Sequence, residues 1–355
     1  MNLKIDHLAK IEGQAGFAAK IIDGQIEAAK IEIEQGRRLI EKILLGRKYD
    51  EAAIITSRIC GICPIVHQIT SLKAIENAFD IQPSEETISW RKIMLYGQIV
   101  QSHSLHLFLL SMDKRFLPLR DFINRLLEII GGRSIHPITP EVGGFKKIPE
   151  KKAVKNLMKN YQKILRTAVD LVPQFRNQPI FYRPTEFRAL NYFGSLAPKA
   201  LGTKLPKSTF MLGALARINL YPDQLNPRAK KFLNFETPSY NTFMNIYSQA
   251  IEIVHFLEEI AKELAQVKFI KSNVEYKIKA GEGNAATEAP RGALYHSYTI
   301  DKNGFIEKAE IITPTFQFIP NLEEDLKVYL EKTQDKEKIK KLISAYDLCI
   351  SCAIH

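Results

Sequence analysis

The chain has 355 residues, of which 45% are hydrophobic and 25% charged, with 18 glycines, 17 prolines and a formal net charge of +11. This composition is close to that of globular proteins and excludes collagen-like, low-complexity and disordered chains. The chain is long enough to bury a large core, and no apolar run approaches the roughly 18 to 20 residues of a membrane-spanning helix, so we expect no direct membrane span.

The predicted elements run from β through α to β along the chain. Residues 17–33 alternate loosely around Asp23-Gly24, and residues 295–312 alternate around Asn303-Gly304. Both turn pairs favour two-residue turns, so we expect a hairpin at each place. Between the hairpins, apolar residues spaced three and four apart predict long helices packed as a bundle. The clearest such stretches are 87–112, 153–172 and 241–267.

The segment 178–240 is rich in Pro, Asn, Phe and Tyr and has no steady period, which predicts irregular packed loops. No internal repeat, low-complexity tract or linker divides the chain. We therefore expect one α+β domain, predominantly α, over residues 1–355. It should contain a central bundle of long helices and small β-hairpin or sheet elements near the N-terminus and around 270–315.

The positive charge is compatible with nucleic acid, anionic lipid or an acidic protein partner. The densest basic stretches, 147–152 and 332–341, include acidic residues and almost no aromatic side chains for base stacking. We interpret them as solvated helix faces and expect no nucleic-acid partner. Charges at Lys4, Asp6 and Lys10 interrupt the apolar segment that an export signal needs, which predicts a cytoplasmic protein that associates with membranes only through partners.

All four cysteines lie in two C-x-x-C pairs, Cys60 with Cys63 and Cys349 with Cys352. A chain of this size does not need disulfides, so we expect reduced thiols that bind metal or do redox chemistry. Four thiolates form a complete ligand set for zinc, an iron–sulfur cluster, copper(I) or nickel, and ligand type alone leaves these metals open. Structural zinc sites usually place their pairs about 15 to 20 residues apart, whereas here nearly the whole chain lies between the two pairs, which disfavours such a site. A thioredoxin-like dithiol would explain only one of the two pairs.

The segments around the two pairs resemble the signature of nickel-iron hydrogenase large subunits. The family has R-x-C-G-x-C-x-x-x-H early and D-x-C-x-x-C-x-x-H at the end, and this chain has RICGICPIVH at 58–67 and DLCISCAIH at 347–355. Other matching segments are KIEGQ at 10–14, GRRLIEKILLGR at 36–47, VQSHSLH at 100–106, APRG at 289–292 and TPT at 313–315. The resemblance thus runs from residue 10 to residue 355, in a chain shorter than many large subunits.

The resemblance implies reversible heterolytic cleavage of dihydrogen at a nickel-iron centre. Cys60 and Cys349 would be terminal nickel ligands, while Cys63 and Cys352 would bridge nickel to an iron that carries carbon monoxide and cyanide. Such cleavage needs a Lewis acid with an open position and a nearby base for the proton. By analogy, Cys349 takes the proton and passes it to Glu12, which without its KIEG context would be interpreted as a surface charge beside a turn.

Further residues acquire roles from the same resemblance. Arg291 would donate to a cyanide from its planar fork, and Thr315 would donate to the second cyanide unless it is only a turn residue after proline. His67, one helical turn after Cys63, would donate to the bridging sulfur. Asp347 resembles an acidic residue near the active site, with a helix N-cap as the alternative. Ser102 is a departure, because several members have aspartate at this position in the histidine-rich helix that also holds His103 and His106.

The family also has a magnesium or iron site, here formed by Glu41 and His355. In the family a maturation endopeptidase cleaves after that histidine, so the resemblance implies that a chain ending at His355 is either the processed form or a sequence that imitates it. The same resemblance implies nickel-insertion proteins as further partners. No cysteine remains for an iron–sulfur cluster, so the electrons must leave through an iron–sulfur small subunit bound across a large interface, and from there to further electron-acceptor subunits.

Two alternatives to a hydrogenase subunit remain. The first is a non-catalytic relative such as the respiratory complex I subunit of the same fold, which lacks the four thiols. The second is a zinc-stabilised nucleic-acid binder, suggested by the basic charge.

Overall fold

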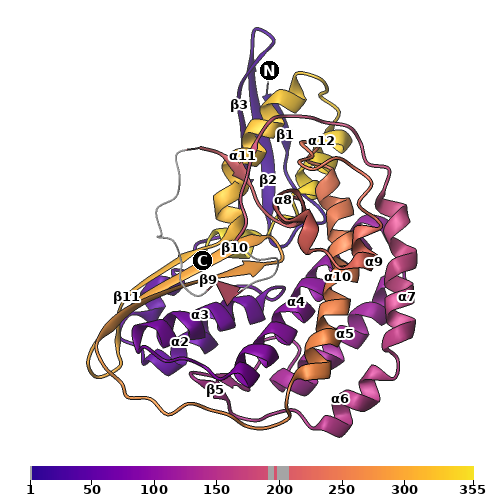
Figure 1. Ribbon diagram of the computed structural model, residues 1–355. Coiled ribbons are helices and arrows are strands. Elements are labelled where there is room, and N and C mark those ends of the chain that lie inside the picture. Colours follow the sequence, from indigo (N-terminus) through magenta and orange to yellow (C-terminus); the bar gives the residue numbers. More distant parts are fainter. Residues whose placement is uncertain (1, 191–195, 198–207) are drawn as a thin grey trace.

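The computed structural model describes residues 2–190, 196–197 and 208–355. Small sheets lie near both ends of the sequence and long helices lie between them (Figure 1). This confirms the predicted α+β class, in which helix predominates over strand.

Strands β1 (Asn2–Ile5), β2 (Ala15–Ile22) and β3 (Gln25–Ile33) form an antiparallel sheet in that order. Asp23 and Gly24 connect β2 to β3 with φ values of 48° and 79°, the positive pair that a type I′ turn requires, so the first predicted hairpin is confirmed. The sheet packs against α11 (Pro314–Leu330), drawn in yellow beside the indigo strands in Figure 1.

The second sheet has the order β11-β10-β9-β7 and is antiparallel throughout. Its strands are β7 (Leu196–Ala197), β9 (Gly281–Ala289), β10 (Gly292–Ile300) and β11 (Ile306–Ile312). The hairpin predicted around Asn303-Gly304 is present, but the prediction of a two-residue turn is wrong. Only Gly304 of that pair has positive φ, at 83°, and the Asp301 carboxylate accepts N–H bonds from Asn303 (2.9 Å) and Phe305 (2.7 Å). These local bonds stabilise a longer loop over 301–305.

Helix α3 (Pro64–Ala78) packs directly on β9 and β10. Glycine permits this close approach, since a Cβ at Gly283 would lie 2.0 Å from the carbonyl oxygen of Ala74. The position of α3 is therefore fixed by backbone contact with the sheet.

The predicted helical bundle is confirmed, with α4 (Glu85–Ser111) packed on both α5 (Phe116–Gly131) and α10 (Met244–Gln266). Helix α4 begins after Ser84, whose hydroxyl accepts from Thr87 N at 3.2 Å as an N-cap. The stretch 153–172 is not one helix. It forms α6 (Lys151–Met158) and α7 (Tyr161–Leu171), separated at Asn160, a residue type that competes with helix hydrogen bonding.

The prediction of irregular loops over 178–240 is only partly correct. The segment contains two short helices, α8 (Ala214–Leu220) and α9 (Pro227–Lys230), and its residues 191–195 and 198–207 lie outside the described residues. The other elements are α1 (Ile40–Leu44), α2 (Tyr49–Thr56), β4 (Pro140–Glu141), β5 (Gly144–Phe145), η1 (Val172–Phe175), β6 (Glu186–Phe187), β8 (Phe210–Met211), η2 (Pro222–Gln224), α12 (Lys336–Ala345) and α13 (Ile350–Ala353).

A contiguous cluster of buried apolar side chains extends from Leu3 to Ile354. It joins the N-terminal sheet to the helical bundle and to the last residues of the chain. Among the helices within the described ranges, none combines the length and the apolarity needed to cross a bilayer.

Candidate metal centre

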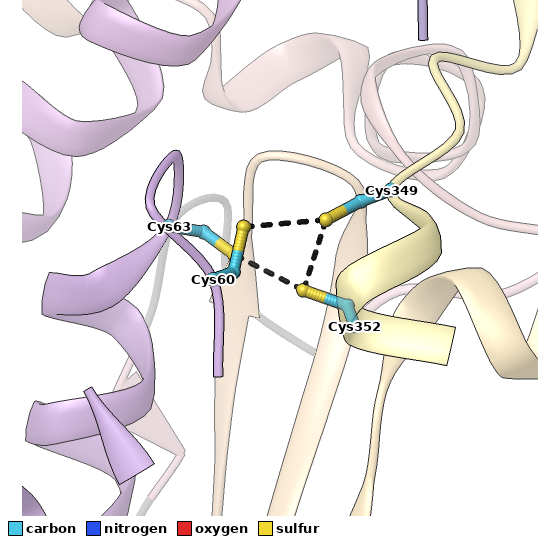
Figure 2. A group of neighbouring side chains, drawn as sticks. All are labelled: Cys60, Cys63, Cys349 and Cys352. Atoms are coloured by element: carbon cyan, nitrogen blue, oxygen red, sulfur yellow. Dashed lines mark hydrogen bonds between the residues drawn. The ribbon is translucent and has the colours of Figure 1, made fainter. Parts of the chain in front are cut away.

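The fold brings the two C-x-x-C pairs together. Cys63 immediately precedes α3 and Cys349 immediately precedes α13, so both pairs lie at the N-terminal ends of helices. Figure 2 shows the four side chains pointing toward one another from the two ends of the chain. The Sγ atoms lie 3.3 Å apart for Cys60 and Cys349, 3.3 Å for Cys63 and Cys352, and 3.1 Å for Cys349 and Cys352, and all four lie within 4.8 Å of one another.

The chemistry of this group suits a soft metal. All four thiols are free and buried, and their separations are far longer than the roughly 2.05 Å of a disulfide. Burial raises the pKa of Cys349 well above its ordinary value, so a cation is needed to hold this sulfur as a thiolate. The four sulfurs therefore fit a bound metal better than they fit isolated core cysteines.

Glu12 reaches this cluster from the loop after β1. Its backbone pairs with the C-terminal segment, since Glu12 N donates to Leu348 O (3.1 Å) and Ile350 N donates to Glu12 O (2.8 Å). The side chain accepts from Cys349 Sγ at 3.2 Å and from the N–H of Ser351 at 2.9 Å, and it also accepts from the Ser351 hydroxyl at 2.6 Å. A half-buried carboxylate thus contacts a thiol of the metal site directly.

Arg291 and Asp347 form a buried ion pair beside the sulfurs. Arg291 Nη2 donates to Asp347 Oδ1 at 2.7 Å, and Nε donates to the Asp347 carbonyl oxygen. The third nitrogen, Nη1, donates to Ser102 Oγ at 3.3 Å. Burial alone would raise the pKa of Asp347, but the charge of Arg291 lowers it, so both groups are ionised. Asp347 has φ of 54° and lies two residues before Cys349, the N-cap residue of α13, so the N-cap alternative is wrong.

A cavity adjoins the side of the sulfur cluster that Cys63 and Cys352 form. Its lining is mostly apolar, with Arg291, Thr315 and His67 as polar members. The full lining is Cys63, Val66, His67, Ala289, Pro290, Arg291, Leu294, Pro314, Thr315 and Cys352. Thr315 lies in the first turn of α11, where its hydroxyl accepts from Cys349 N at 3.3 Å.

His67 lies on α3 with its Nε2 3.6 Å from Cys352 Sγ. Burial lowers the pKa of His67 to about 3, so the ring is neutral and has one hydrogen to donate.

The last residue is held by polar contacts to α1 and β11. His355 Nε2 lies 3.1 Å from Glu41 Oε1 and 2.9 Å from the carbonyl oxygen of Ile311. Burial would raise the pKa of Glu41, but the hydrogen bond with His355 lowers it. A carboxylate, an imidazole and a carbonyl oxygen thus converge, a donor set that a hard divalent cation accepts.

Several buried residues of this region carry no local sequence signal. His296 lies 3.2 Å from His67, and Arg217 donates to both Glu252 and Glu288 with all three side chains fully buried. Their partners are remote in sequence, so only the fold reveals them. Ser351, by contrast, lies between Cys349 and Cys352, so the sequence itself indicates that it is close to the site.

Comparisons with known proteins agree with this geometry. The family model described as nickel-dependent hydrogenase matches residues 38–113 and 240–355. Sulfhydrogenase 1 subunit alpha of Pyrococcus furiosus is 31% identical over an alignment that covers 99% of this chain and 97% of the relative, and sulfhydrogenase 2 subunit alpha is 27% identical over 100% and 99%.

The fold is shared with solved hydrogenases. An NAD+-reducing [NiFe]-hydrogenase in the H2-reduced state superposes with a TM-score of 0.85 and 22% identity, covering 100% of this chain and 99% of that one. The Ni-Fe-Se hydrogenase of Desulfomicrobium baculatum gives a TM-score of 0.79 and 20% identity, with both chains covered completely. The predicted family is confirmed: this chain belongs to the nickel-dependent hydrogenases, as an enzyme subunit of the catalytic, large-subunit type.

Proposed function

We propose that this chain catalyses the reversible heterolytic cleavage of dihydrogen to protons and electrons. The observation that carries the proposal is the group of four free, buried sulfurs within 4.8 Å, one of which contacts the carboxylate of Glu12. When bound, a nickel-iron pair supplies the Lewis acidity and electron storage that this reaction requires.

The four cysteines divide into two roles. Cys60 and Cys349 would hold nickel alone, whereas Cys63 and Cys352 would hold both metals. The cavity supports this division, since its lining includes only Cys63 and Cys352 among the four. The small diatomic ligands of iron, carbon monoxide and cyanide, would lie on the same side, where Arg291 and Thr315 of the cavity lining would donate to the two cyanides.

The proton leaves through residues of this chain. Cys349 Sγ receives it, and Glu12 Oε2, 3.2 Å away, accepts it next. Arg291 stays charged through its pair with Asp347 and would stabilise an anionic centre beside it. Because Glu12 is only half-buried, its carboxylate can deliver the proton toward solvent.

The electrons need a partner, since all four cysteines of the chain lie in the metal site. We propose an iron–sulfur small subunit, which passes electrons to further acceptor subunits. Exposed aliphatic side chains at the end of β3 and along α1, the helix that carries Glu41, support a protein interface there, with exposed fractions of 36% to 48%. They are Ile33, Leu39, Ile43 and Leu45.

We also propose a second metal site, with Mg²⁺ or Fe²⁺ held by Glu41, His355 and the Ile311 carbonyl. A maturation endopeptidase and nickel-insertion proteins would assemble the site, in a cytoplasmic protein without nucleic-acid partners. Residues 1–355 would form one domain, supported by the core that extends from Leu3 to Ile354.

Metal analysis and hydrogen-dependent dye reduction of the purified complex test the proposal. We expect about one nickel per chain, dye reduction under hydrogen, and infrared bands of carbon monoxide and cyanide. Replacing Cys63 by serine should remove the metals and the activity while leaving the helical bundle folded. Active material that contained zinc and no nickel would refute the proposal.

A further inference from the structure

Arg217 lies on α8 with a fully buried guanidinium that donates from all five of its hydrogens. Its Nε and Nη2 donate to the two carboxylate oxygens of Glu252, each at 2.7 Å, and its Nη1 donates to Glu288 Oε2 at 2.8 Å. The other two hydrogens bond backbone oxygens. Nη1 donates to the carbonyl oxygen of Ala289 at 2.9 Å, and Nη2 donates to that of Pro290 at 3.0 Å.

These two backbone oxygens belong to the hairpin turn that carries Arg291. Strand β9 ends at Ala289, β10 begins at Gly292, and these two residues are paired. Pro290 and Arg291 are therefore the two residues of the turn. Pro290 has no N–H group, so its carbonyl is the only backbone group through which another residue can bond it. Arg217 thus bonds the two consecutive carbonyls that precede Arg291.

The start of α8 also packs directly on this turn. Gly213, the N-cap residue of α8, has φ of 94°, and a Cβ there would lie 3.4 Å from the carbonyl oxygen of Arg291. Gly292 has φ of 124°, and a Cβ there would lie 2.5 Å from Leu212 Cβ. Two glycines therefore allow the helix that holds Arg217 to approach the backbone at Arg291 closely.

Two buried carboxylates fix the orientation of Arg217. A guanidinium that is removed from water is costly unless it is paired and fully hydrogen-bonded. Glu252 comes from α10 and Glu288 from β9, and both side chains are 0% exposed. Together they hold the charged group in one orientation, with its two remaining hydrogens directed at the turn.

Arg291 is consequently held at both ends. Its guanidinium donates to Asp347 Oδ1 at 2.7 Å and to Ser102 Oγ at 3.3 Å, which holds the tip of the side chain. Arg217 holds the backbone from which that side chain starts. The direction in which Arg291 enters the site therefore depends on Arg217 as well as on its own partners.

We propose that Arg217 is a positioning residue that fixes the Pro290-Arg291 turn and thereby directs the Arg291 guanidinium toward the metal centre. This inference deepens the proposed function and rests on it, because it takes Arg291 to donate to a ligand of the metals. A side chain that starts from a loosened turn meets that ligand with altered geometry. A misplacement of about 1 Å is enough to lower a rate by as much as about 100-fold.

Arg217→Lys tests the proposal, because it keeps the positive charge and removes hydrogens. An ammonium has three hydrogens, and the two carboxylates attract them more strongly than neutral carbonyls do, so the bonds to the turn are lost first. Arg91→Lys is the matched control. Arg91 is 1% exposed and donates to both carboxylate oxygens of Glu76 and to the carbonyl oxygen of Glu141 at 3.0 Å. Glu76 lies roughly 20 Å along α3 from the end that adjoins Cys63.

Each variant is purified as the complete complex, and the readouts are nickel content, the infrared bands of the two cyanides, turnover and melting temperature. Both variants should retain nickel, and both should melt at a lower temperature because each loses buried hydrogen bonds. Only Arg217→Lys should shift a cyanide band, the same band that Arg291→Lys shifts, and its turnover should fall by about 10-fold. The double variant Arg217→Lys/Arg291→Lys should lose less turnover than the product of the two single losses, because both changes act on one interaction.

Three results would each overturn the positioning role and leave the proposed function intact. They are unchanged cyanide bands in Arg217→Lys at full nickel content, an equal band shift in Arg91→Lys, and turnover losses that multiply in the double variant. A wild-type complex without nickel would refute the proposed function and this inference with it.

If Arg217→Lys does not fold, Glu288→Gln removes one charged partner of Arg217 instead, with Glu76→Gln as its control. We then expect a smaller shift of the same cyanide band in Glu288→Gln and no shift in Glu76→Gln. An unchanged band in Glu288→Gln would overturn the positioning role.

Discussion

Replacing Glu12 by glutamine isolates the proton-accepting ability of this side chain. The carboxylate accepts from Ser351 N and Cys349 Sγ on one oxygen and from the Ser351 hydroxyl on the other. An amide oxygen can retain the first two bonds, and the amide NH₂ can donate to the Ser351 hydroxyl, which also accepts. Geometry and hydrogen bonding are therefore preserved, while the side chain can no longer take a proton at neutral pH.

The expected loss of exchange rate follows from the role of Glu12 as a general base. A positioned general base contributes about 10² to 10⁴ in rate, which corresponds to roughly 3 to 5 kcal/mol of barrier. We expect Glu12→Gln to lower hydrogen–deuterium exchange into solvent by this factor. Folding stability should change by less than about 1 kcal/mol, since no buried group loses its partner. Exchange is measured by mass spectrometry of the gas phase above the purified complex, with nickel content as the check on assembly.

Ser351→Ala is the matched control, because it removes one partner of Glu12 and leaves the carboxylate. Its backbone N–H still donates at 2.9 Å, so exchange should fall by less than about 10-fold. Wild-type exchange in Glu12→Gln would contradict the relay. Loss of nickel in the same variant would show instead that Glu12 serves to assemble the site.

Three further outcomes follow from the structure. Arg291→Lys keeps the charge but loses the planar fork, so turnover should fall about 10- to 100-fold while metal analysis still finds nickel. Burial would raise the pKa of Glu252, yet the charge of Arg217 holds it at about 2, below the ordinary 4.5. A carboxyl group whose pKa is lowered by folding stabilises the folded protein at pH values above its ordinary pKa, and this stabilisation is lost as the pH falls. Denaturant titrations should therefore show that the free energy of unfolding drops by about 3 kcal/mol between pH 5 and 2, and Glu252→Gln should abolish this drop. Gly283→Ala places a Cβ 2.0 Å from a carbonyl of α3 and should lower the melting temperature and the nickel content, unlike Gly36→Ala, where nothing lies within 4 Å.

Local chemistry made part of the fold predictable. Asp23-Gly24 has two residues suited to positive φ, and both adopt it. The Asn303-Gly304 pair carries the same signal, but the Asp301 carboxylate offers competing bonds to two nearby N–H groups, and the loop follows those bonds. Periodicity located α4 and α10 within a few residues, yet it could not reveal the break at Asn160, because the apolar spacing continues on both sides of it.

The candidate site likewise contains residues that the sequence identified and residues that it missed. Spacing identified the four thiols, and flanking motifs identified Glu12 and Arg291 as neighbours. His296 and Tyr298 were missed, because their partners His67 and Ser71 lie more than 200 residues away and no motif records that contact. Such residues become visible only when packing brings a strand and a helix into register.

The segment that holds the second cysteine pair has little regular secondary structure, so contacts with other parts of the chain hold it in place and couple the metal site to the N-terminal sheet. Helix α13 has only four residues, too few to be stable alone. Its position depends on the backbone pairing with Glu12, on Arg38, which donates to Ser351 O at 2.6 Å, and on Thr313, whose hydroxyl donates to Cys352 O at 2.7 Å. The first pair, by contrast, is anchored on α3 and its backbone contact with β9. Loosening of the segment that holds Glu12 should therefore displace the C-terminal thiols before the helical bundle unfolds, so metal would be lost at a lower denaturant concentration than helix.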